Sequence, residues 1–173
     1  MRGQEKWRQM ELVVKADADA LYIPPRLQDV LAKQLQPGVG VHFGDCKGVV
    51  SGFFGGLEVI STAGWKIFVD KLENCKAELP WDGAEVDGWK YGPWGEDKFA
   101  QECMDKGGVM KLPLFELTYD GLCPSDRPKD QPKGTIFHPP CWNSSAPATH
   151  PFMGVDAWKT CYDETASAHK IFQ

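Results

Sequence analysis

The interpretation of the chain starts from nine residues, Leu12-Val13-Val14-Lys15-Ala16-Asp17-Ala18-Asp19-Ala20. The apolar run at their start predicts a buried strand. If the chain stays extended beyond it, Asp17 and Asp19 point to the same side, because side chains alternate along a strand. Two carboxylates at the end of a buried strand favour a cation beside them, and Mg²⁺ and Mn²⁺ prefer such oxygen ligands. The stretch therefore predicts a divalent metal site, and the alternative is a solvated turn that carries two surface acids.

A second acidic motif lies about eighty residues further on, where a Gly/Pro/aromatic turn is followed by Glu96-Asp97. These two acids fall in the first turn of a predicted helix that has Phe99, Cys103 and Met104 on one face and ends at Gly107. Acids in a first helical turn also act simply as partners of the helix dipole. The motif is thus either part of a site or a helix-stabilising feature.

The order of three segments resembles the glycosyltransferases of the GT-A fold, especially the inverting β-1,3-glycosyltransferases related to fringe. The three segments are the Asp17-Ala18-Asp19 motif, the glycine-rich run from Gly52 to Ser61, and Glu96-Asp97. The similarity extends from about Leu12 to Val109. It implies an α/β fold with a mixed sheet flanked by helices, and a single partial GT-A-like domain over residues 1–173. Residues 12–117 would form its core and residues 118–173 an irregular, disulfide-stapled C-terminal extension.

The resemblance also implies a reaction and a set of residues. The reaction is transfer of a sugar from a nucleotide-sugar donor, a UDP-sugar, to a hydroxyl of a glycan or glycoprotein acceptor with inversion. Asp17, Asp19 and His150 would hold Mn²⁺ or Mg²⁺, Asp97 would be the general base and Glu96 would position the acceptor; Phe54, Gly55, Gly56 and Trp94 would bind substrate. Family domains place a nucleotide-binding βαβ region before the Asp-x-Asp strand, and only about ten residues precede it here, so we expect that region to be missing.

Several alternatives remain at the level of sequence. The chain could be a non-catalytic carbohydrate-binding or interaction domain derived from a glycosyltransferase. Asp17 with Glu96 or Asp97 could form a glycosidase pair that needs no metal, although the Asp-x-Asp spacing favours a metal. His138 is a rival to His150 as a ligand, and either histidine could be a hydrogen-bonded loop residue.

Composition limits the class of protein. A chain of 173 residues with 42% hydrophobic content suits one compact domain. The net charge of -5 and the sequence pI near 5.4 argue against a nucleic-acid partner, which requires clustered Lys and Arg. The sequence has no apolar run of about eighteen residues, so we expect no membrane span within it.

The six cysteines are widely spaced and form no Cys-x-x-Cys motif. This spacing argues against a zinc ribbon and favours disulfides. Disulfides, together with the resemblance, predict the secretory pathway, either the Golgi lumen or the exterior. Cys123 with Cys141 is the expected pair, and Cys103 is the best candidate for a buried free thiol. Asn143-Ser144-Ser145 is a glycosylation sequon consistent with that compartment.

Secondary structure is predicted from local signals. Pro24-Pro25 starts a helix with an apolar stripe that runs to Leu35, and Ser61 or Thr62 caps a helix whose core residues are Trp65, Phe68, Val69 and Leu72. Residues 39–43 and 48–50 are expected as a hairpin at a sheet edge. Residues 109–117 are predicted as an edge strand interrupted by Pro113, and residues 155–166 as a helix that packs Trp158 and Tyr162 against the body.

Overall fold

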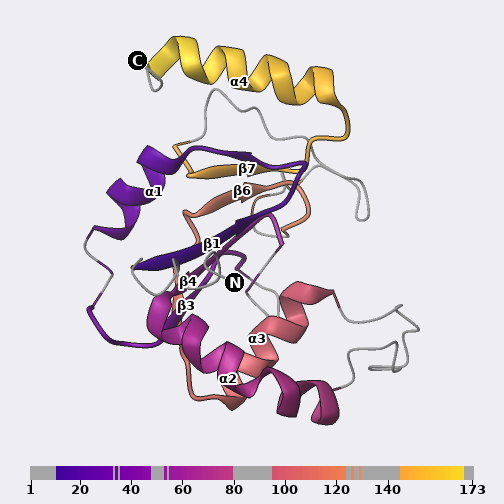
Figure 1. The fold of residues 1–173 in the computed structure, drawn as a ribbon. Helices are drawn as coiled ribbons and strands as arrows, with labels where there is room; N and C mark the ends of the chain where they lie inside the picture. Colours follow the sequence, from indigo (N-terminus) through magenta and orange to yellow (C-terminus); the bar gives the residue numbers. More distant parts are fainter. Residues whose placement is uncertain are drawn as a thin grey trace, which may run out of the picture.

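The computed structural model of the chain describes residues 11–32, 34, 36–47, 53, 55–79, 95–123, 126, 129 and 145–169. Within these ranges the protein is a mixed α/β fold with two mixed sheets and four helices (Figure 1). The strands are β1 (Leu12–Ala16), β2 (Leu21–Tyr22), β3 (Val41–Gly44), β4 (Leu57–Ser61), β5 (Met110–Pro113), β6 (Thr118–Asp120) and β7 (Ala148–His150). The helices are α1 (Pro24–Leu31), α2 (Thr62–Glu78), α3 (Glu96–Lys106) and α4 (Val155–His169).

The first sheet has the strand order β1-β4-β3-β5. Strand β4 pairs antiparallel with β1 and β3, and β3 pairs parallel with β5. The expected hairpin edge is therefore wrong for β3, because this strand lies inside the sheet; residues 48–50 lie outside the described ranges. The edge strand predicted over residues 109–117 is confirmed in its first half, where β5 lies at the edge of the sheet and ends at Pro113.

The second sheet has the order β2-β7-β6 and brings together segments more than a hundred residues apart. Strand β7 pairs antiparallel with β2 and parallel with β6, which places Asp120 opposite His150. We expected residues 118–173 to be irregular before the last helix. Instead, β6 and β7 form two strands of this sheet, and both are only three residues long, too short for a period-two pattern to be recognised.

The sheets and helices are stacked in layers (Figure 1). One apolar cluster lies between the two sheets and includes residues of α1; its most buried members include Leu31, Phe43, Leu57, Val59 and Leu117. A second cluster packs α2 and α3 against the other face of the first sheet. A third joins the second sheet to α4, and Trp158 and Tyr162 pack against it as the sequence predicted. Their rings are also stacked on each other, with centroids 5.5 Å apart.

Local signals in the sequence mark three of the helix ends. Pro24 begins α1, Ser61 caps α2 by accepting a hydrogen bond from the Gly64 amide at 3.1 Å, and Gly107 ends α3. Two details differ from expectation. Helix α1 ends at Leu31 and does not extend to residue 35, and Val69 is 42% exposed and so is not part of the core.

Two disulfides join pairs of described cysteines, one between the segments that follow β3 and β6 and one between α2 and α3. Cys46 pairs with Cys123 and Cys75 with Cys103, while Cys161 is also disulfide-bonded. The prediction of disulfides is confirmed, but the Cys123 pairing was wrong, as was the buried free thiol at Cys103. Both errors share one cause, because spacing along the chain does not reveal which elements pack together. The disulfides are compatible with an extracellular or secretory-pathway location; the sequon at Asn143 lies outside the described residues.

In the described part of the chain, the helices are all too short or too polar to cross a bilayer.

Candidate functional site

The site begins at the turn that joins β1 to β2. The chain does not stay extended after Ala16, because the Ala20 amide donates to the Asp17 carbonyl at 3.0 Å and closes a tight turn. The Phe152 amide, which follows β7, donates to the Asp19 carbonyl at 2.8 Å. The turn is thus attached to the segment after the second sheet. The sequence prediction of an extended Asp-x-Asp was wrong in geometry, although both side chains still reach one site.

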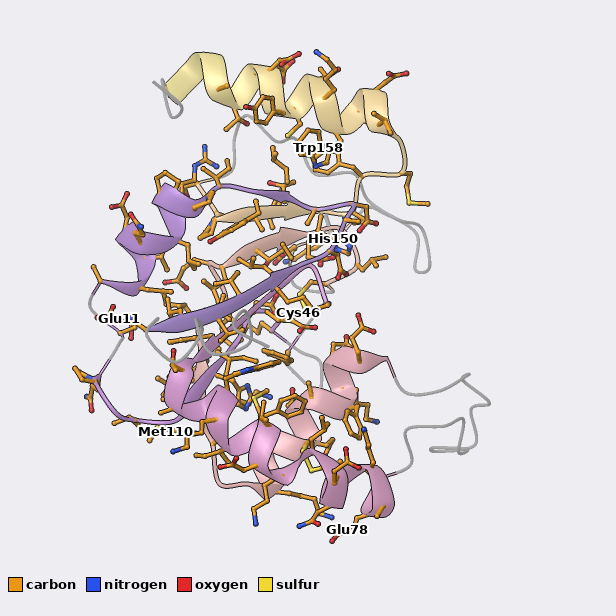
Figure 2. All side chains as sticks on the ribbon, viewed as in Figure 1. Glu11, Cys46, Glu78, Met110, His150 and Trp158 are labelled. Atoms are coloured by element: carbon orange, nitrogen blue, oxygen red, sulfur yellow. A yellow bond between two sulfur atoms is a disulfide. The ribbon has the colours of Figure 1, made fainter. Side chains whose placement is uncertain are left out.

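Asp17, Asp19 and His150 form a group that could hold a metal ion. One ligand atom from each lies within 4.8 Å of the other two. The imidazole Nε2 of His150 lies 3.4 Å from Asp19 Oδ1 and 3.9 Å from Asp17 Oδ2. His150 lies at the end of the second sheet, next to the turn that carries the two acids (Figure 2). Two carboxylates and one imidazole are a donor set that suits Mn²⁺ and similar divalent ions.

His150 is buried and is in contact with a third carboxylate. Its Nδ1 lies 2.8 Å from Oδ2 of Asp120, and the two side chains are 8% and 2% exposed. Burial works against the charged imidazole, but the hydrogen bond to Asp120 and the charges of Asp120, Asp19 and Asp17 outweigh it and raise the pKa of His150.

A lysine on β1, Lys15, lies among three acidic side chains that come from different parts of the chain. Lys15 Nζ contacts Asp17 Oδ1 at 2.8 Å, Glu58 Oε1 at 3.1 Å and Glu96 Oε1 at 3.1 Å. Burial disfavours the charged amine, but its hydrogen bond to Asp17, the charge of Glu58 and its hydrogen bonds to both glutamates raise the pKa of Lys15. Lys15 therefore links Asp17, a member of the candidate metal-ligand group, to Glu96 at the start of α3.

Glu58 lies opposite Lys15 in the pairing of β1 with β4 and is only 4% exposed. Burial raises its pKa from 4.5 to about 7, in spite of the opposing charge and hydrogen bond of Lys15; the charges of Asp97 and Glu96 add to the rise. Near neutral pH this carboxyl group is therefore only partly ionised.

The two glycines before β4 allow the acidic groups to approach the backbone. A Cβ on Gly55 would lie 2.9 Å from Asp17 Oδ2 and 4.0 Å from Asp97 Oδ2. A Cβ on Gly56 would lie 2.9 Å from the Cβ and Cγ atoms of His150. Both predicted glycines thus border the site, and any side chain at Gly56 would collide with the buried imidazole.

The two acids that open α3 lie near the same group, since the charge of Asp17 acts on Asp97, and Lys15 contacts both Asp17 and Glu96. Glu96 is 71% exposed, and a hydrogen bond with its own backbone amide and then one with Lys15 lower its pKa. Asp97 accepts a hydrogen bond from the Lys98 amide at 2.7 Å, and burial raises its pKa, with the charges of Glu96 and Asp17 adding to the effect. A half-buried carboxylate of this kind is a candidate proton acceptor.

Other predicted residues cannot be placed in the site. Phe54 and Trp94, expected to bind substrate, and the rival ligand His138 lie outside the described residues. A cavity of about 860 Å³ lies at the opposite end of β1, where Leu12, Leu31, Thr62 and Lys66 are among its lining residues, and this lining includes no predicted site residue.

Sequence reasoning missed three residues that contact the site, namely Lys15, Glu58 and Asp120. Lys15 and Glu58 become neighbours only through the β1–β4 register, and Asp120 reaches His150 only through the β6–β7 register. The one available signal was Lys15 itself, a charged residue within an otherwise apolar strand.

The described site combines a group of metal-ligand type, a neighbouring half-buried carboxylate and glycines that leave the backbone accessible. No protein-family model and no curated protein sequence matches the chain. The chemistry of these residues is therefore the basis for a functional proposal.

Proposed function

We propose that the chain belongs to a metal-dependent glycosyltransferase of GT-A type, which transfers a sugar from a nucleotide-sugar to a hydroxyl acceptor with inversion. The observation that carries the proposal is the convergence of Asp17, Asp19 and His150, which come from opposite ends of the sequence and lie within 4.8 Å of one another. The resemblance of the three sequence segments to the fringe-related enzymes supports it, as does the position of Asp97 beside the same group.

The ligand group fits a hard or borderline divalent ion. Asp19 is the more exposed of the two acids, at 47% against 29%, so it offers the more accessible oxygen, while the buried imidazole is held in place by Asp120. A bound Mn²⁺ or Mg²⁺ would neutralise the charge that develops on a diphosphate leaving group. Gly55 and Gly56 leave room for such a group close to the backbone.

Asp97 is the residue we assign as general base. The Lys98 amide donates to one carboxylate oxygen, Oδ1, while the other, Oδ2, would lie 4.0 Å from a Cβ on Gly55, the same Cβ that would meet Asp17 Oδ2 at 2.9 Å. The raised pKa of Asp97 strengthens it as an acceptor for the proton of an attacking hydroxyl. Glu96 is more exposed and is held by Lys15, which suits a role in positioning the acceptor. The disulfides fit the secretory compartment where glycoprotein acceptors occur.

The test is a calorimetric titration with UDP, with and without Mn²⁺, followed by assays of UDP-sugar hydrolysis across several sugars. We expect UDP to bind only when Mn²⁺ is present, and Asp19→Ala to abolish this binding because Asp17 and His150 alone leave an octahedral ion with too few protein ligands. Asp29→Ala, which removes an exposed acid from α1, is the control and should bind as the wild type does. Equal Mn²⁺ affinity in Asp19→Ala would rule out the metal site. Sugar binding without turnover would favour a non-catalytic carbohydrate-binding domain instead.

A further inference from the structure

Asp120 is a buried carboxylate that lies directly behind His150. It is 2% exposed and stands opposite His150 in the parallel pairing of β6 with β7. Its Oδ2 lies 2.8 Å from Nδ1 of the imidazole, on the side of the ring away from Asp17 and Asp19. Burying a carboxylate is costly unless its oxygens are satisfied, so the position calls for a specific role.

Both oxygens of Asp120 face N–H groups. Oδ1 accepts a hydrogen bond from the Leu122 amide at 2.7 Å, and Oδ2 faces the imidazole Nδ1. Because an ionised carboxylate can only accept, the ring must carry its proton on Nδ1 when it is neutral. The lone pair of the ring is then on Nε2, the nitrogen that lies 3.4 Å from Asp19 Oδ1.

We propose that Asp120 is the positioning residue of the metal site, which fixes the tautomer and orientation of His150 so that Nε2 is available to a divalent cation shared with Asp17 and Asp19. The inference rests on the metal site in the proposed function. Gly56 contributes to the same arrangement, since a Cβ at this position would lie 3.0 Å from Asp120 Oδ2 and 2.9 Å from the ring. The imidazole is thus confined on one side by the backbone and held on the other by the carboxylate.

Asp120→Asn tests the proposal because it changes the hydrogen-bonding pattern while keeping the shape. An amide has one acceptor oxygen, and the Leu122 amide is a donor that cannot change. The oxygen of the new side chain therefore faces Leu122 and its NH₂ group faces Nδ1 of His150, which moves the ring proton to Nε2. We expect Mn²⁺, titrated alone, to bind about 10 to 100 times more weakly.

The ring proton can be observed directly in metal-free protein by ¹⁵N NMR, at a pH above the titration of the imidazole. We expect the proton on Nδ1 in the wild type and on Nε2 in Asp120→Asn, with the His150 signals assigned by their loss in His150→Gln. A role limited to folding would not move this proton. A neutral wild-type ring protonated on Nε2 would overturn the proposal even if the variant failed to fold.

Asp45→Asn is the matched control. Asp45 is equally buried, at 2%, and its Oδ2 accepts a hydrogen bond from the Thr118 hydroxyl at 3.1 Å, a group that can rotate to meet an amide. We expect wild-type Mn²⁺ affinity in this variant. Equal losses in both variants, or unchanged affinity in Asp120→Asn, would show that Asp120 does not position His150. Neither result would argue against the metal site itself. Absence of Mn²⁺ binding by the wild type would overturn the metal site and this inference together.

Discussion

Replacing Glu58 by glutamine should remove a large pH dependence of stability. Glu58 is 4% exposed and contacts Lys15 at 3.1 Å, yet burial raises its pKa from 4.5 to about 7. The folded protein therefore binds this proton more tightly than the unfolded chain does. The stabilisation is complete below pH 4.5, is lost as the pH rises towards 7, and stays absent above it.

The size of the effect follows from the two pKa values. Each pKa unit corresponds to about 1.4 kcal/mol, so the free energy of unfolding should fall by about 3 kcal/mol between pH 4.5 and pH 8 through Glu58. Glu58→Gln keeps a side chain of the same size and an oxygen that can accept from Lys15, but it cannot ionise. The stability of the variant relative to the wild type should thus rise by about 3 kcal/mol over that range, or roughly 6 to 12 °C in Tm.

The measurement is urea unfolding followed by tryptophan fluorescence, at several pH values and with a chelator present. Glu73→Gln is the control, because Glu73 on α2 is 83% exposed and paired with Lys76 on the surface. Its stability relative to the wild type should stay nearly constant with pH. If the difference for Glu58→Gln also varied by less than about 0.5 kcal/mol, Lys15 would be compensating fully for the burial of the carboxylate, and the reasoning about Glu58 would be wrong.

Three further predictions concern the proposed general base Asp97, the glycine at position 56 and the disulfide between Cys46 and Cys123. Asp97→Asn should lower the rate of sugar transfer about 10² to 10⁴-fold and change the free energy of unfolding by at most about 1 kcal/mol. A loss of rate that unfolding explains would show that Asp97 is not part of the proposed active site. Gly56→Ala should weaken the proposed Mn²⁺ binding in calorimetry because its Cβ would lie 2.9 Å from the side chain of His150, and wild-type affinity would contradict that contact. Replacing Cys46 and Cys123 together by serine should cost about 4 kcal/mol in urea unfolding, since the bond spans 77 residues, and a loss below about 1 kcal/mol would show that the linkage does not restrain the unfolded chain.

Features of the fold that depend on neighbouring residues were predictable from the sequence. Pro24, the Ser61 cap and the Gly107 stop each act within one helical turn, and all three mark real helix ends. The short strands of the second sheet were not predictable, because their positions depend on pairing with segments far away in the chain. For the same reason Cys123 was assigned the wrong partner.

The residues of the candidate site also fall into those that the sequence predicted and those that depend on the pairing of distant strands. Asp17, Asp19 and His150 stood out because their residue types and order resemble a known motif, and the structure brings them together. Asp120 lies in Thr118-Tyr119-Asp120, which has no motif, and it becomes relevant only when β6 pairs with β7. Residues that bind a ligand can therefore be recognised by their chemistry, whereas residues that orient them require the register of the sheets.

The charges around the end of β1 give the physical reason to expect a cation there. Six carboxyl groups come together in this region, on Asp17, Asp19, Glu58, Glu96, Asp97 and Asp120. Lys15 and His150 supply positive charge. Burial, with the charges of Asp97 and Glu96 adding to it, raises the pKa of Glu58 to about 7, so this carboxyl group carries less than a full negative charge near neutral pH. Asp19 is 47% exposed and Asp17 29%, so a divalent ion could reach both from solvent and would relieve the repulsion further than Lys15 and His150 do alone.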